Sequence, residues 1–206
     1  MEKRTIPFDG AQPLDAEPPP PPEIAPPGRG NPWVFAYGSL MWEPGFPHLA
    51  RRRAKLFGYH RAFCVWSYHY RGTRRDPGLV LGLAPGGSCV GRAIQIARAD
   101  WAMVLDYLYR REMLTGCYLP RFVRVRMANG RKNGRIVTAL AFVVDRSHRE
   151  YAGRLSEDKI VSVIGKSHGR RGPGREYLAE TVGHLDELGI ADGPLHHLWR
   201  RVMGGG

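Results

Sequence analysis

The chain has few cysteines and no long apolar run. Its three cysteines, Cys64, Cys89 and Cys117, are an odd number without a CxxC spacing, which argues against a disulfide framework and against a zinc ribbon. No run of eighteen apolar residues occurs, and the N-terminus lacks the apolar stretch of a signal peptide. We therefore expect a cytoplasmic protein in a reducing compartment, without a membrane partner.

Motifs that bind metals are also missing. No HxH or HExxH pair occurs in the sequence. His196 and His197 are adjacent, and neighbouring side chains on a helix diverge by about 100°, which makes it difficult for them to share one ion. We therefore expect no metal site.

Basic residues are abundant, but no nucleic-acid motif accompanies them. The net charge is +12, and residues 31–206 carry 28 basic against 14 acidic side chains, a balance that suits a nucleic-acid partner. The arginines are scattered, however, without a helix-turn-helix, zinc finger or RNP motif. The favoured interpretation is a solvated basic surface with no nucleic-acid partner, although a positive field would equally attract an anionic small substrate.

Proline is concentrated near the N-terminus. Residues 1–30 hold nine of the seventeen prolines, five of them consecutive from Pro18 to Pro22. Such a segment cannot bury enough apolar surface to offset the entropy lost when it becomes ordered. We predict a disordered or polyproline II tail over 1–30, one folded domain over 31–203 and a flexible C-terminus over 204–206.

The rest of the chain shows strand patterns first and helix patterns later. Apolar and alternating runs predict strands at 33–37, 56–70, 79–83, 89–96, 121–127 and 136–144, with a hairpin turn between the last two. Helical periodicity and caps predict helices at 100–114, after Ser156, at 175–188 and after Asp192. This order indicates an α+β domain, a small mixed or antiparallel β-barrel with helices packed outside.

One acidic residue on the first predicted helix departs from the ordinary pattern. Trp101, Val104, Leu105 and Leu108 form one apolar stripe. Glu112 follows Trp101 by eleven positions, and eleven helical steps return to within about 20° of the same face. If the helix stays regular, this carboxyl group lies on the buried face, where it needs a partner.

The residues alone leave two interpretations of Glu112 open. In the first, it forms an ion pair with Arg110, Arg111 or Arg121, as a buried carboxylate commonly does. In the second, an apolar wall raises its pKa toward neutrality, which suits a general base that later returns its proton as an acid.

Five sequence blocks occur in order between about residues 32 and 190. They are VFAYGSLMW (34–42), HYRGT (69–73) with PG (77–78), YLYRRE (107–112), YAG (151–153) and GPGREYL (172–178). Together they resemble the signatures of the ChaC-like branch of the γ-glutamyl cyclotransferases, whose core is Tyr-Gly-Ser-Leu after a strand. Many members have Gly-Gly-Tyr closely after the glutamate, whereas this chain has the longer run Met113 to Tyr118.

The resemblance implies a γ-glutamyl cyclotransferase-like fold and an enzyme that cleaves glutathione to 5-oxo-L-proline and L-cysteinylglycine. Glu112 matches the acid/base position. The positions that match the family's substrate-binding motifs are Ala36, Tyr37, Gly38, Ser39, Leu40, Met41, Arg71 and Tyr151. Because the substrate's own α-amine is the nucleophile in this family, the resemblance implies no cofactor and no metal.

Two alternatives remain open beside glutathione cleavage. A cyclotransferase of the same fold could act on other γ-glutamyl-amino acids or γ-glutamylamines. A non-catalytic basic protein could instead contact nucleic acid or regulate ion transport, and it would show salt-sensitive polynucleotide binding without turnover.

Overall fold

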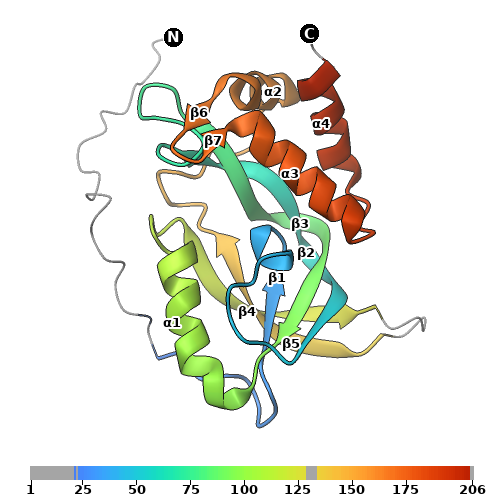
Figure 1. Ribbon diagram of the computed structural model, residues 1–206. Coiled ribbons are helices and arrows are strands. Elements are labelled where there is room, and N and C mark those ends of the chain that lie inside the picture. Colours follow the sequence, from blue (N-terminus) through green and yellow to red (C-terminus); the bar gives the residue numbers. More distant parts are fainter. Residues whose placement is uncertain (1–20, 22, 129–133, 205–206) are drawn as a thin grey trace.

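Five strands close into a barrel in the computed structural model, which describes residues 21, 23–128 and 134–204 (Figure 1). The order of hydrogen-bonded neighbours is β1-β3-β2-β4-β5. The strands are β1 Trp33–Ala36, β2 Ala50–Ser67, β3 Gly78–Gln95, β4 Tyr118–Met127 and β5 Ile136–Val144. The pairing of β1 with β5 is parallel and the other pairings are antiparallel. The predicted α+β class and mixed barrel are confirmed.

Helices cover the outside of this barrel on two sides (Figure 1). One helix lies along one side, and three helices pack against one another at the end of the barrel where the C-terminus lies. The helices are α1 Trp101–Glu112, α2 Glu157–Lys166, α3 Gly174–Glu187 and α4 Gly193–Gly204, with short 3-10 turns η1 Ser39–Met41 and η2 Arg98–Asp100. A two-stranded ribbon, β6 His168–Gly169 with β7 Gly172–Pro173, connects α2 to α3.

Two segments that the sequence predicts as separate strands, 79–83 and 89–96, form the single strand β3. Gly86 and Gly87 lie inside it with φ of 97° and 68°. The pairing with β2 shifts register between Phe57 and Tyr59, opposite this glycine pair. The prediction of two strands was wrong because a bulge absorbs the extra residues and lets Pro85 remain within a continuous ladder.

The helix predictions agree well with the structure. Trp101, Val104, Leu105 and Leu108 are buried, and α1 ends at Glu112. The predicted cap of α2 is present, since the Ser156 side chain accepts a hydrogen bond from the Lys159 amide.

The sequence pattern predicts that Leu195, Leu198, Trp199 and Val202 form one apolar face of α4, and this prediction is correct in part. Leu195 and Leu198 are buried, but Trp199 is exposed. That part of the prediction was wrong, because α4 packs on α2 and α3 through a face too narrow to include Trp199.

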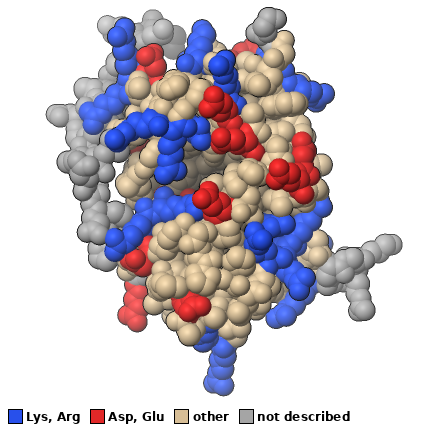
Figure 2. All heavy atoms as spheres, viewed as in Figure 1, with Lys and Arg blue, Asp and Glu red and all other residues tan. Residues whose placement is uncertain are grey.

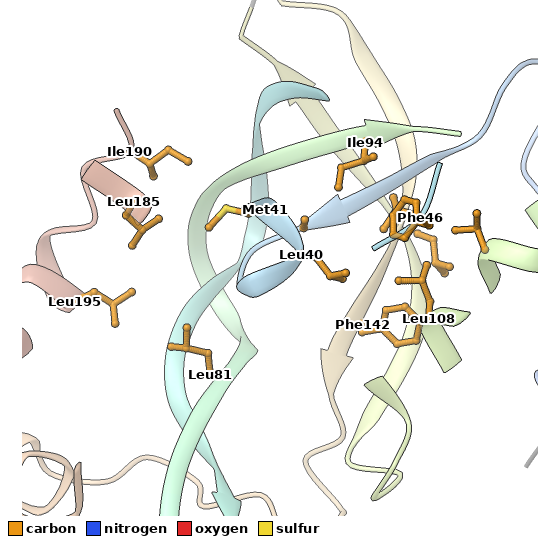
Figure 3. Close-up of a cluster of buried hydrophobic side chains, with 14 of the residues drawn as sticks. Leu40, Met41, Phe46, Leu81, Ile94, Leu108, Phe142, Leu185, Ile190 and Leu195 are labelled. Carbon is orange, nitrogen blue, oxygen red and sulfur yellow. The ribbon is translucent and has the colours of Figure 1, made fainter. Parts of the chain in front are cut away.

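The main hydrophobic core runs from the barrel into the helices (Figure 3). Leu40 and Met41 of η1 belong to it together with Leu81 of β3 and with Leu185 and Leu195 of the C-terminal helices. The Met41 side chain is completely buried. The bend at the end of β1 is therefore anchored by the core, and a loop held in this way keeps a fixed shape.

Some predictions lie outside the described residues. They concern residues 1–20 and 22 of the proline-rich segment, the hairpin turn at 129–133 and residues 205–206. Residues 24–30 lie against the start of α1, where Trp101 Nε1 donates to the carbonyl of Ile24 at 2.7 Å and Arg98 donates to the carbonyls of Gly28 and Gly30. The domain bounds remain a prediction. None of the described helices is long and apolar enough to span a membrane.

Candidate active site

The end of α1 borders a cavity with two chambers. The inner chamber, of about 80 Å³, is lined by Tyr37, Gly38, Ser39 and Leu40 of the bend together with Glu112 and residues of β3, β4 and α3. The outer chamber, of about 200 Å³, is lined by residues of β2 and the loop after it, by the end of α1, and by Glu150 and Arg171. Both chambers share Glu112 in their lining. Figure 2 shows a hollow in the face of the molecule that is viewed in Figure 1, with basic side chains above and below the hollow.

Glu112 keeps a raised proton affinity although a cation lies beside it. Its side chain is 19% exposed, and Arg111 Nε lies 3.5 Å from its Oε1. Burial raises the pKa of Glu112, and Arg111 offsets only part of this effect. Of the three arginines considered from the sequence, Arg111 makes the ion pair, whereas Arg110 pairs with Asp106 at 2.9 Å. The carboxyl group therefore has both a charged partner and the raised pKa that suits proton transfer.

Arg111 also joins the helix end to the bend. Its Nη2 donates to Ser39 Oγ at 2.8 Å. Its Nη1 donates to the Glu43 carbonyl at 3.0 Å and to the Tyr107 hydroxyl at 2.8 Å. The sequence indicates Arg111 only as an ion-pair partner and does not predict this bridge, because the bridge depends on a segment 72 positions earlier in the chain.

The bend that lines the inner chamber contains backbone N–H donors. The amide of Met41 donates to the Gly38 carbonyl at 2.9 Å, and the amide of Glu43 donates to the Ser39 carbonyl at 2.8 Å. The amides of Ser39 and Leu40 begin this short turn and have no hydrogen-bond partner within the described part of the chain. A Cβ at Gly38 would meet nothing within 4 Å. Glycine therefore leaves open space beside two amides that are able to bind an oxygen atom.

Three tyrosines surround the carboxyl group in the inner chamber. They are Tyr37, Tyr118 and Tyr177. Burial raises the pKa of each phenol, and the charge of Glu112 raises it further. Tyr118 already donates its hydroxyl to the Leu81 carbonyl at 2.8 Å. The phenols stay neutral, so Tyr37 and Tyr177 can donate hydrogen bonds without adding a charge, whereas the Tyr118 hydroxyl can only accept a further one.

Comparisons with known proteins identify the family. The model of the ChaC-like protein family matches residues 32–204. The chain belongs to this family. It is 36% identical over 172 residues to the glutathione-specific γ-glutamylcyclotransferase of Escherichia coli K12, covering 84% of this chain and 73% of that protein. It is 32% identical over 153 residues to glutathione-specific γ-glutamylcyclotransferase 1 of Danio rerio, covering 73% and 77%.

A solved structure has the same fold as this ChaC-like chain. The crystal structure of a γ-glutamyl cyclotransferase specific to glutathione from yeast matches with a TM-score of 0.77 at 22% identity. The match covers 85% of this chain and 97% of the yeast chain. The fold and the family that the sequence blocks predict are thereby confirmed.

The ChaC-like motif positions do not all meet at the cavity. Tyr37, Gly38, Ser39 and Leu40 line the inner chamber beside Glu112. Ala36 and Met41 are completely buried, are not among the cavity-lining residues and belong to the core cluster that anchors the bend. Their side chains support the loop rather than contact the cavity.

Arg71 and Tyr151, the other two motif positions, lie outside both chambers. Arg71 lies with its Cζ 5.0 Å from the centre of the Tyr177 ring and donates to the Arg171 carbonyl at 2.6 Å. Tyr151 forms a β-bridge with Val65 and lines a separate cavity. Arg71 therefore reaches the site indirectly, through the Tyr177 ring and the Arg171 backbone. The sequence blocks contain Tyr177 but do not indicate a role for it.

Among the described residues of this ChaC-like chain, one group of side chains lies close enough together to hold a metal. The ligand atoms of Cys117, His148 and Glu150 lie within 4.8 Å of one another. His148 Nδ1 already accepts the Glu150 amide at 3.2 Å. Burial raises the pKa of the Cys117 thiol to about 12, so a metal would have to displace a tightly held proton.

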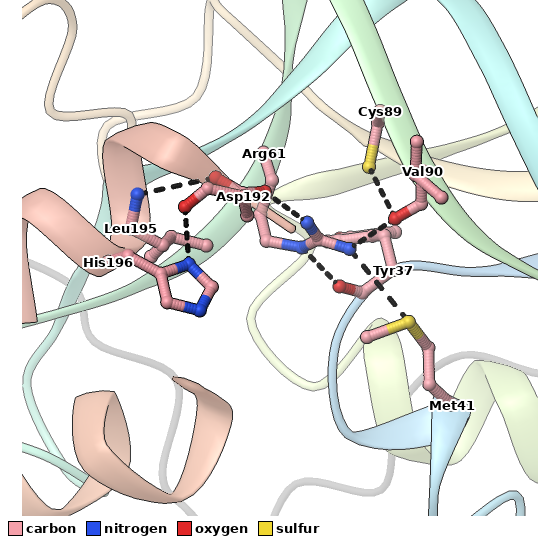
Figure 4. A network of polar contacts seen from close by, with 8 residues as sticks. All are labelled: Tyr37, Met41, Arg61, Cys89, Val90, Asp192, Leu195 and His196. Carbon is pink, nitrogen blue, oxygen red and sulfur yellow. Dashed lines mark hydrogen bonds and ion pairs between the residues drawn. The ribbon is translucent and has the colours of Figure 1, made fainter. Parts of the chain in front are cut away.

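A buried arginine that no sequence pattern indicates supports the bend from behind (Figure 4). The Arg61 side chain is 1% exposed and forms an ion pair with Asp192 at the start of α4. It also donates to the carbonyls of Tyr37 and Val90 and contacts the sulfur of Met41. The aromatic pattern around residue 61 predicts a strand but does not reveal that this charge points inward.

Proposed function

We propose that this ChaC-like chain is a γ-glutamylcyclotransferase that cleaves glutathione to 5-oxo-L-proline and L-cysteinylglycine. One observation carries the proposal. A carboxyl group with a raised pKa, Glu112, lines the same small chamber as the free amides of the bend at Ser39 and Leu40. The names of the Escherichia coli and Danio rerio relatives support the choice of glutathione.

In the proposed reaction, the substrate attacks itself. The α-amino nitrogen of the γ-glutamyl unit attacks the γ-carbonyl carbon, and the new C–N bond closes a five-membered lactam. The bond between that carbon and the cysteine nitrogen then breaks. One proton leaves the attacking nitrogen and one arrives on the departing nitrogen, so water, cofactor and oxidant are not consumed.

Glu112 carries that proton in our proposal. A free α-amino group titrates near pH 8, so a base is needed to keep it neutral at pH 7. The departing amine leaves readily only after it gains a proton. A carboxyl group whose pKa is raised can both accept and return one, a contribution of about 10²- to 10⁴-fold to the rate.

The bend stabilises the negative charge that develops on the γ-carbonyl oxygen. The amides of Ser39 and Leu40 are donors fixed by the core beneath them, and a donor of this kind contributes about 3–4 kcal/mol in measured systems. The neutral tyrosine hydroxyls of the inner chamber can bind the polar groups of the γ-glutamyl unit. Confinement in about 80 Å³ favours the folded conformation from which the amine attacks.

Two further observations support the proposal. Arg111 contacts both Ser39 and Glu112. It therefore keeps the residue that carries the amide donor and the acid/base carboxyl group in a fixed relative position. The three cysteines are free and buried, which supports the reducing, cytoplasmic location expected from the sequence.

The test is a direct assay of 5-oxoproline. Purified protein is incubated with glutathione and, separately, with γ-glutamylalanine, and 5-oxoproline is measured by mass spectrometry. We expect release from glutathione, and no release by a Glu112→Gln variant that still unfolds in one cooperative thermal transition. If 5-oxoproline is released from γ-glutamylalanine but not from glutathione, the enzyme acts on other γ-glutamyl compounds instead of glutathione. Near-normal turnover by Glu112→Gln would refute the mechanism.

A further inference from the structure

The outer chamber has one basic side chain without an anionic partner. Among its basic lining residues, Arg111 is occupied by Glu112 and by three oxygen acceptors. Burial, and then the charge of Arg74, lower the pKa of His69, so that its ring is neutral at pH 7. The guanidinium of Arg171 has no ion pair or hydrogen-bond acceptor within the described residues. Arg171 is therefore the available cation of the chamber.

The backbone of Arg171 is fixed on the ribbon formed by β6 and β7. Its amide donates to the Tyr70 carbonyl at 2.9 Å, and its carbonyl accepts Arg71 Nη1 at 2.6 Å. The ribbon also packs tightly, because a Cβ at Gly169 would come within 2.5 Å of the Gly72 amide. These contacts place residue 171 at the chamber wall before any ligand arrives.

The side chain of Arg171 is also partly oriented. Its Cζ lies 4.6 Å from the centre of the Tyr70 ring. This cation–π contact favours the observed position of the guanidinium over the other positions that the side chain could take. A planar guanidinium has a fork of N–H donors that matches both oxygens of a carboxylate. Arg171 therefore gives the wall of the outer chamber a group that is suited to bind a carboxylate.

We propose that Arg171 forms a subsite for the C-terminal carboxylate of the dipeptide that leaves the substrate. The inference rests on the proposed function, in which the γ-glutamyl unit occupies the inner chamber beside Glu112. The leaving dipeptide then extends into the outer chamber, and an extended chain spans about 3.3–3.6 Å per residue. Its free carboxylate is the only anionic group on that side of the bond to be cleaved.

An acidic residue elsewhere on the outer lining favours the same orientation. Glu150 lines this chamber as well, and an acidic side chain repels a carboxylate. A dipeptide end that carries a negative charge is thus attracted to Arg171 and kept from Glu150. Arg171 is a specificity-determining residue for substrates with a free carboxyl end.

The experiment pairs a change in the enzyme with a matched change in the substrate. Wild type and Arg171→Ala are assayed with glutathione and with glutathione amidated at its glycine carboxylate. We expect Arg171→Ala to lower kcat/KM for glutathione about tenfold, mainly through KM, and to leave kcat/KM for the amide within about twofold. The wild type should discriminate against the amide by the same factor, and Arg171→Lys should retain part of the discrimination.

Arg170→Ala is the control. Arg170 is the neighbouring exposed arginine and is absent from the lining of both chambers. Its removal changes the net charge equally and should leave both substrates unaffected. An equal loss for glutathione and for the amide in Arg171→Ala, or no loss for glutathione, overturns the proposal.

A failure of the subsite can be separated from a failure of the proposed function. If the wild type releases 5-oxoproline from neither compound, the proposed function fails. Calorimetric binding of the two compounds then tests the subsite by itself. The proposal requires glutathione to bind the wild type more tightly than the amide and requires that preference to disappear in Arg171→Ala; equal Kd values in the wild type overturn it.

Discussion

Arg61 and Asp192 form an ion pair that connects the bend at the inner chamber to the start of α4 (Figure 4). Arg61 donates to the Tyr37 carbonyl on one side, and Asp192 caps α4 on the other by accepting the Leu195 amide at 3.3 Å. The pair joins segments 131 positions apart. The C-terminal helices therefore help to hold the bend in place.

We predict that Asp192→Ala destabilises the protein strongly. The change leaves the buried Arg61 charge without its partner, and loss of one member of a buried pair costs about 3–5 kcal/mol; the low end applies because Asp192 is 14% exposed. Urea unfolding measures the difference. The control is Asp186→Ala, which removes an exposed partner of His196 and should cost less than about 1 kcal/mol.

The double variant Arg61→Met/Asp192→Ala provides a second check on this pair. Replacing a buried ion pair by an apolar side chain is often neutral, so the double variant should recover much of the stability that Asp192→Ala loses. If the double variant is as unstable as the sum of its two single variants, the pair contributes no coupling energy.

Glu112 should make the stability of the protein fall as pH rises. Because burial raises the folded-state pKa above 4.5, the folded state binds more protons than the unfolded state between the two pKa values. Stability then decreases with rising pH across that window. Glu112→Gln lacks this loss, so it should match the wild type near pH 4 and be more stable than the wild type at pH 7. Thermal unfolding of both proteins from pH 4 to 8 tests this, and parallel curves would contradict it.

Arg111 should set the acidic limb of the pH–activity profile. The limb in kcat/KM reports the pKa of the free enzyme's base, and Arg111 lowers the pKa of Glu112. We predict that Arg111→Met moves the limb to higher pH, in addition to any loss of turnover caused by releasing Ser39. An unshifted limb would show that Glu112 is not the group titrating. A variant at the neighbouring Arg110, which pairs with Asp106 on the surface, should leave the limb where it is.

Gly38→Ala should reduce activity while the protein remains folded. The Gly38 φ is −123°, which other residues adopt, and a Cβ there would meet no atom within 4 Å. The methyl group would occupy space in a chamber of about 80 Å³, so we expect kcat/KM to fall by at least about tenfold, as for misplacement of a substrate. The unfolding temperature should change by only a few degrees.

Gly91→Ala provides the contrasting control for Gly38. A Cβ at Gly91 would lie 2.2 Å from the Ala36 carbonyl oxygen, so this variant should lose stability. If Gly38→Ala unfolds as easily as Gly91→Ala, the role assigned to the open space at Gly38 is incorrect.

Local patterns were sufficient for most of the secondary structure. The stripe from Trp101 to Leu108 predicts α1 because helical periodicity is a property of neighbouring residues, and Ser156 predicts the start of α2 for the same reason. The continuous strand β3 was missed because Gly86 and Gly87 normally indicate a turn. Only the pairing with β2 turns them into a bulge.

The candidate site was predicted in part. Glu112 and the bend were found from the sequence, and they line one chamber. Arg71 and Tyr151 were placed in the site by motif alone, and they lie outside both chambers. A motif position records which residue type occurs, and it does not record whether the side chain contacts the cavity or supports a residue that does.

By itself, the sequence determined the family blocks, the order of strands and helices and the acidic residue at the end of α1, since each depends on residues close together in the chain. Tertiary structure alone decided which side chains share the cavity. Closure of the barrel and docking of the β6–β7 ribbon bring Ser39, Glu112 and Arg171 to one cavity. Contacts between segments so distant in sequence depend on global packing, which no local pattern encodes.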